Sequence, residues 1–100
     1  MNRDVFHAIS DPTRRAILKE LLKESQNVNS LSSKFDMTRQ AVSLHLKLLE
    51  ECNVINVQQD GRQRLCSLRF EELQEVQRWL KPFKEIWEAR FDSLDELLTD

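Results

Sequence analysis

Residues 38–51 read TRQAVSLHLKLLEE, and this segment predicts a helix with one narrow polar side. Thr38 is a good N-cap residue, so we expect the helix to span 39–51 and to end at Asn53. At 100° per residue, a polar stripe about 100° wide holds Arg39, Gln40, Ser43, Lys47 and Glu50. Apolar residues fill most of the remaining circumference: Ala41, Val42, Leu44, Leu46, Leu48 and Leu49. Arginine, glutamine and serine can reach base edges or phosphates, so the stripe is typical of a DNA-reading helix, although any surface helix has a polar side.

Upstream of this helix the sequence predicts a second short one. Asn29 or Ser30 would cap it, and it would run to about Phe35, before a turn at Asp36-Met37. Two short helices joined by a tight turn form a helix-turn-helix.

The first part of the chain predicts two further helices. The first spans about 2–9. Ser10 or Asp11 then caps an amphipathic helix over 13–23, with Pro12 in its first turn. Gln26-Asn27 are expected to be loop, and Val28 a stub of strand.

Downstream of the reading helix the apolar period changes to that of strands. β-Branched residues precede Asp60-Gly61, a strong hairpin-turn signal, and a second strand follows. The sequence therefore predicts a two-stranded hairpin over about 54–69, with Arg62 and Arg64 at its tip. A basic ribbon tip can contact the DNA backbone or a narrow minor groove, although arginine is also ordinary on a solvated tip.

The last third of the chain predicts amphipathic helix over about 70–98. Because Pro82 lacks an N–H group and clashes with the preceding turn, we expect one helix to end near Leu80 and another to begin at Pro82. The expected fold is mainly helical with one small hairpin, in the order ααααββαα, as a single domain over 1–100. An aromatic stripe on the tail is expected to be core, part of it between subunits if the chain pairs with a second copy, with a small-molecule pocket as the alternative.

Charge is distributed unevenly along the chain. The net charge is −2, yet residues 28–69 carry six basic and four acidic side chains, and residues 70–100 carry four and nine. Such segregation lets one face approach phosphate while another stays away from it. The amino terminus lacks the apolar stretch of a signal peptide, and no run is long enough to cross a membrane, so we expect a cytoplasmic protein.

At this point the chain resembles the ArsR (arsenical-resistance repressor) family of winged-helix regulators. The resemblance rests on three segments: 10–18 (SDPTRRAIL), 38–49 (TRQAVSLHLKLL) and Gly61-Arg62. It implies a winged helix-turn-helix that binds a twofold double-stranded DNA operator as a homodimer and represses transcription. It also implies DNA-binding roles for Thr38, Arg39, Gln40, Ser43, Leu44, Lys47, Arg62 and Arg64. Dimerisation through the terminal helices, about 2–9 and 70–98, would use Val5, Phe6, Trp79, Phe83, Trp87, Phe91 and Leu94.

The chain departs from the metal-sensing members of that family. Residues 29–36 hold no Cys-x-Cys pair, and no histidine follows His45, so we predict no metal site and no cofactor. No nucleotide fingerprint or catalytic constellation is present, and we predict no enzyme activity.

Several roles stay open from the sequence. His45 is expected to be a buried, hydrogen-bonded histidine, with a phosphate contact as the alternative. Cys52 and Cys66 are expected to be small apolar filler, with a thiol switch as the alternative. Arg14 or Arg15 could contact DNA or pair with acids. A protein-interaction module that reads no bases, or a repressor that responds to a thiol reagent or an unknown effector, are the competing functions.

Overall fold

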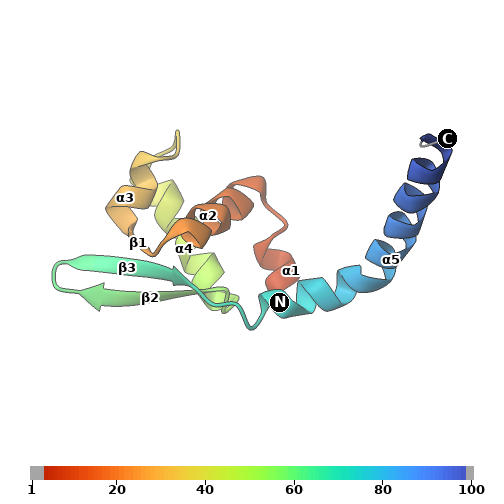
Figure 1. Ribbon diagram of the computed structural model, residues 1–100. Coiled ribbons are helices and arrows are strands. Elements are labelled where there is room, and N and C mark those ends of the chain that lie inside the picture. The colour runs from red at the N-terminus through yellow and green to blue at the C-terminus, as the bar shows by residue number, and fades with distance from the viewer. Residues whose placement is uncertain (1–3, 99–100) are drawn as a thin grey trace.

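A computed structural model describes residues 4–98 as a small helical body from which one long helix projects (Figure 1). The overall dimensions are 61 × 29 × 21 Å. The elements in chain order are α1 (Val5–Ala8), α2 (Pro12–Lys23), β1 (Gln26–Asn27), α3 (Val28–Ser33), α4 (Arg39–Glu51), β2 (Ile55–Asp60), β3 (Gln63–Leu68) and α5 (Leu73–Leu98). The order ααβααββα replaces the expected ααααββαα, because a short strand precedes α3 and the tail is one helix.

Side-chain caps begin the first two helices. Asp4 accepts a hydrogen bond from the His7 N–H, 2.9 Å away, at the start of α1. Asp11, rather than Ser10, caps α2, and Pro12 occupies its first turn as predicted. The Arg14 N–H donates to the Asp11 carboxylate, and this bond lowers the pKa of Asp11. Residues 2 and 3 of the predicted first helix lie outside the described residues.

The sheet has three strands in the order β1-β3-β2, all antiparallel. The prediction that Gln26-Asn27 are loop was wrong, because both residues pair with β3: Gln26 lies opposite Cys66 and Asn27 opposite Leu65. The predicted strand stub at Val28 was wrong too, since Val28 is the first residue of α3. Asn27 caps that helix by accepting from the Ser30 N–H at 2.7 Å, in place of the expected Asn29 or Ser30, and the helix ends at Ser33 rather than near Phe35.

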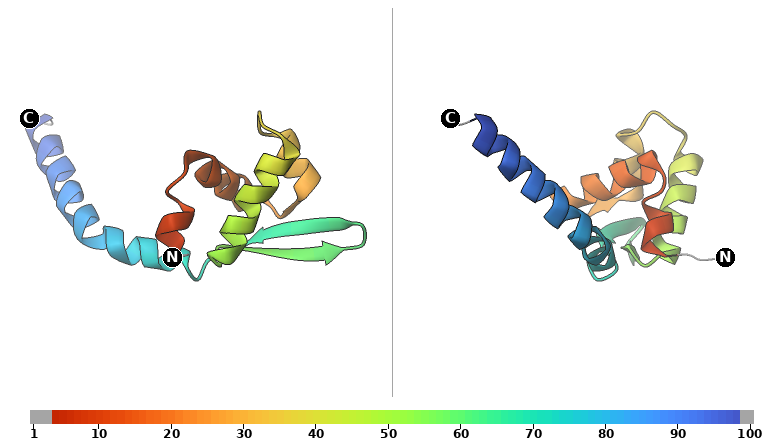
Figure 2. Two further views of the ribbon diagram at one scale, coloured as in Figure 1. Left: turned by 180° about the vertical axis from the view of Figure 1, so that it is seen from behind. Right: turned by 90° about the vertical axis from the view of Figure 1, so that its right-hand side faces the viewer.

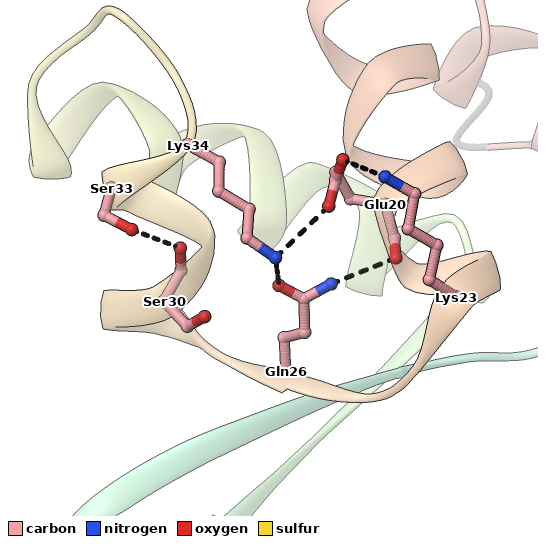
Figure 3. A network of polar contacts seen from close by, with 6 residues as sticks. All are labelled: Glu20, Lys23, Gln26, Ser30, Ser33 and Lys34. Atoms are coloured by element: carbon pink, nitrogen blue, oxygen red, sulfur yellow. Dashed lines mark hydrogen bonds and ion pairs between the residues drawn. The ribbon is translucent and has the colours of Figure 1, made fainter.

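A polar network joins α2, β1 and the end of α3 (Figure 3). The Lys34 Nζ donates to Gln26 at 2.6 Å and to Glu20 at 3.3 Å, while the Gln26 amide donates to the Glu20 carbonyl. Lys23 also donates to Glu20, and the two lysines together lower the pKa of that carboxyl. Gln26, only 5% exposed, therefore has both the oxygen and the nitrogen of its side-chain amide paired. The network holds the C-terminal end of α3 against α2 and β1.

The apolar core lies where α1–α4 meet the start of the sheet. Its fully buried members come from nearly every one of these elements: Val5, Ala8, Ile17, Leu31, Val42, Leu49 and Cys66. The chain thus packs α4 against its core and leaves the opposite side of α4 facing outward.

The tail is a single helix, α5, and the predicted break at Pro82 was wrong. Proline removes one backbone hydrogen bond and crowds the preceding turn, which bends a helix without necessarily ending it. α5 changes direction along its length accordingly (Figures 1 and 2). Because the apolar residues keep helical spacing on both sides of Pro82, the two halves share one continuous apolar face.

Candidate nucleic-acid interface

The helix α4 occupies the predicted residues and has the predicted cap. The Thr38 hydroxyl accepts a hydrogen bond from the Ala41 N–H, 3.1 Å away, so the helix begins at Arg39 as expected. Val42, Leu46 and Leu49 face the core and are at most 4% exposed. Arg39, Gln40 and Lys47 are exposed and Ser43 is half-buried, so the polar stripe lies on the outer side of the helix.

Leu44 does not lie among the buried residues of α4. Its side chain is 69% exposed, although the wheel placed it in the apolar arc. At 100° per residue Leu44 lies roughly 160° from the centre of the buried face, next to the polar stripe. The side chain is therefore accessible at the surface, and the DNA-facing position that the family resemblance implies for it stays a prediction.

The hairpin of β2 and β3 forms a wing beside α4 (Figure 1). Asp60 pairs with Gln63, which leaves Gly61-Arg62 as a two-residue turn. Gly61 has a φ of 63° at the first central position, where a type II′ hairpin turn requires a positive value. The turn places Arg62 at the exposed tip, and Arg64 follows it on β3.

The space between α4 and the wing is an open groove of about 660 Å³. Six of the predicted DNA-binding residues line it, five from α4 and Arg64 from the wing; those of α4 are Arg39, Gln40, Ser43, Leu44 and Lys47. A neighbouring hollow of about 170 Å³ adds Arg62 and shares Arg39, Ser43 and Arg64 with the groove. Four cationic side chains thus converge from two elements, and Glu50 is the one carboxylate that lines either space within residues 4–98.

Sequence reasoning missed the polar residues that connect this groove to the start of α3. Asn29, Gln59 and Gln63 line the smaller hollow. The Asn27 amide donates to the Gln63 side chain at 3.2 Å, which joins the cap of α3 to the wing. The short strand β1 brings them together, and a two-residue strand has no detectable period in a sequence.

Arg14 and Arg15 hold the junction between α1 and α2. Arg14 is 9% exposed and donates to the carbonyls of Ala8 (2.9 Å) and His7 (3.1 Å) and to the Ser10 hydroxyl. Arg15 donates to the Ile9 carbonyl at 2.7 Å from an exposed position. Arg14 is therefore a structural residue of this junction, paired with carbonyls rather than with acids.

The two cysteines have the predicted burial, and His45 does not. Cys52 and Cys66 are at most 1% exposed, as expected of apolar filler. Burial raises the pKa of the Cys66 thiol, which disfavours the reactive thiolate and speaks against a thiol switch. His45 is half-buried rather than fully buried.

The residues predicted for dimerisation differ in how far they are exposed. Val5 is wholly buried in the core of the chain, so it offers no surface to a partner. Phe6 is half-buried against Trp79, with ring centroids 5.9 Å apart. The remaining residues are between 42% and 63% exposed along α5: Trp79, Phe83, Trp87, Phe91 and Leu94.

Within residues 4–98, no three His, Cys, Asp or Glu side chains are placed to hold a metal ion. In the same part of the chain, no helix combines the length and apolar character needed to cross a membrane.

Comparison with known proteins identifies the family. Residues 11–57 match the family described as bacterial regulatory protein, arsR family. The chain is 34% identical to the transcriptional repressor SdpR of Bacillus subtilis (strain 168) over 80 residues, which cover 80% of this chain and 89% of that protein.

Solved structures show the same fold. The crystal structure of an ArsR family transcriptional regulator is 36% identical and superposes with a TM-score of 0.72, covering 84% of this chain and 87% of the other. An ArsR-like transcriptional regulator from Rhodococcus sp. RHA1 is 31% identical with a TM-score of 0.68, covering 93% and 88% of the two chains. The chain therefore belongs to the ArsR family, and it is a winged helix-turn-helix DNA-binding transcriptional regulator rather than an enzyme.

Proposed function

We propose that the chain is a transcriptional repressor that binds a twofold operator as a homodimer. The placement of Arg39, Gln40, Ser43, Arg62 and Arg64 around the open groove and its neighbouring hollow carries the proposal, because these side chains come from both the reading helix and the wing. Arginine and glutamine read base edges in the major groove, and a basic ribbon tip suits the adjacent backbone or minor groove. The name of SdpR supports repression as the outcome of binding.

The acidic tail does not oppose this role. α5 projects away from α4 and the wing, so its carboxylates lie far from the groove (Figure 1). The net charge of −2 therefore hides a cationic face that can meet phosphate.

The proposed partner of the apolar face of α5 is a second copy of the chain. No residue of α5 is buried in the single chain, although its aromatic residues form one continuous face. Large contiguous apolar faces that are exposed in a single chain mark interaction surfaces. A dimer through α5 and α1 would place two copies of α4 in successive major grooves, about 34–36 Å apart.

The test is selection of bound duplexes from a randomised DNA library, followed by transcription in vitro from a promoter that overlaps the selected sequence. The proposal expects an enriched sequence with twofold symmetry, a Kd on the order of 10⁻⁸ to 10⁻¹⁰ M for it, and reduced transcription. Absence of enrichment would favour a protein-interaction module without base readout, and enrichment with unchanged or increased transcription would contradict repression.

A further inference from the structure

Leu44 is an exposed apolar side chain beside the polar stripe of α4. It is 69% exposed, and the residues of α4 that line the groove next to it are polar or cationic: Arg39, Gln40, Ser43 and Lys47. The other apolar residues of the groove, Val28, Leu46 and Val57, are buried or half-buried. Gln40 precedes it by four positions and Lys47 follows it by three, so the three side chains are neighbours on one face of the helix.

Packing within the subunit does not account for this leucine. The core takes Val42, Leu46 and Leu49 from the opposite side of α4, and Leu44 is outside that cluster. The apolar face of α5 does not account for it either, because α5 leaves the body at the other end of the molecule (Figure 2). Leu44 therefore belongs to the surface that faces the proposed DNA.

The chemistry of the major groove offers one apolar partner on the base edges, the C5-methyl group of thymine. The other features there are hydrogen-bond donors and acceptors, to which a leucine is indifferent. From the exposed position of Leu44 between Gln40 and Lys47, we propose that its side chain contacts a thymine methyl group in each half-site and selects T·A over C·G there. The inference rests on the proposed function and adds the kind of base that this position of α4 recognises.

The probe is the duplex selected with the wild-type protein, in which each thymine of a half-site, and its symmetry mate, is replaced by deoxyuridine. Deoxyuridine keeps the O4 acceptor and base pairing and loses only the methyl group. Burying one methyl group contributes enough to change Kd about fourfold, so the symmetric replacement at the contacted thymine should weaken binding about 15-fold. Fluorescence anisotropy at fixed salt measures each Kd.

The variant Leu44→Ala separates a methyl contact from an effect of the replacement on DNA shape. The wild type should lose affinity at one symmetric pair of thymines, and Leu44→Ala should bind the thymine and deoxyuridine duplexes equally. Leu22→Ala removes a leucine of similar exposure, 63%, from α2 and should keep the wild-type response.

Three results would overturn the inference. The wild type could show no sensitive thymine, or Leu44→Ala could retain the full sensitivity; in both cases base-specific binding survives and the contact alone is wrong. If the wild type selects no sequence at all, the proposed function fails as well, and the two failures are thereby distinguished.

Discussion

The proposed function assigns two roles to single side chains of the groove: some would discriminate between bases and others would bind the DNA backbone. Arg39 stands in the first turn of α4, exposed and shared by both hollows, where a guanidinium can bond to a guanine edge. Arg62 stands at the tip of the wing, where the proposed function predicts a contact with a phosphate. The two arginines should therefore respond differently to the DNA sequence.

Arg39→Ala should cost about 1–3 kcal/mol of binding to the selected operator and relax preference at one base pair of each half-site. Binding to unrelated DNA should change far less, because the lost contact is to a base. Anisotropy titrations with the operator, with single-base-pair variants and with unrelated DNA measure this. Arg78→Ala, which removes an exposed arginine from α5, is the control for charge. An equal loss on all duplexes would contradict the assigned role.

Arg62→Ala should weaken binding to operator and unrelated DNA by a similar factor. The slope of log K against log salt should fall by about one per subunit, because one fewer phosphate is neutralised. Titrations at several salt concentrations give that slope for the wild type and the variant. A loss confined to the operator would show instead that Arg62 reads sequence.

At the residue scale the sequence located most of the groove. Polar side chains recur on α4 at helical spacing, and Asp60-Gly61 fixes where the wing turns. The sequence alone therefore predicted that Arg39, Ser43, Arg62 and Arg64 lie on the reading helix and the wing, and these residues line the groove and the hollow beside it. The helical wheel alone did not predict the exposure of Leu44, because a wheel separates polar from apolar residues and does not show which side packs; only the family resemblance implied a surface position for it. A helix that rests on one core buries one side only, whatever its composition.

At the scale of elements, the junction between α1 and α2 depends on one buried guanidinium. Arg14 satisfies two carbonyls that end α1 and one hydroxyl in the turn, and Arg15 satisfies one carbonyl from the surface. Adjacent arginines thus differ in burial and in the number of their partners.

Arg14→Ala should lower the free energy of unfolding by about 2–3 kcal/mol, since it leaves the buried carbonyl of Ala8 without its donor and removes a buried side chain from the junction. Arg15→Ala is the matched control and should stay within about 0.5 kcal/mol of the wild type. Urea unfolding followed by circular dichroism, at one protein concentration for all variants, gives both values. Equal losses for the two variants would refute the structural role of Arg14.

The elements also show why parts of the fold were not predictable. Helices α2 and α4 carry caps and periodic apolar residues, and both begin and end where the sequence indicated, within one residue. Strand β1 is two residues long and exists because β3 pairs with it, which is a tertiary effect. Pro82 predicted a break, but the long apolar face on both sides of it supports a single bent helix.

At the scale of the whole molecule, α5 is the element through which the proposed dimer would form. Its apolar face is unpartnered in one chain, and its 26 residues extend well beyond the contact between Phe6 and Trp79. Pairing of this face between two subunits would set the distance between the two copies of α4.

Trp87→Glu should dissociate the proposed dimer, because it places a charge in the middle of the apolar face. Ala89→Glu adds the same charge two residues away, on the opposite side of the helix, and should leave the dimer intact. Sedimentation equilibrium measures the mass of each variant, and operator affinity should fall together with dimerisation. A wild type that is monomeric at micromolar concentration would contradict the proposed assembly.

The most direct test of base reading by a paired subunit is a hydroxyl-radical footprint of the wild-type protein on its selected operator. Two reading helices in successive major grooves predict protected backbone segments related by twofold symmetry and repeated about 10–10.5 base pairs apart, with further protection where the wings reach the flanking DNA. A single unsymmetrical patch of protection, or uniform protection without a repeat, would contradict it.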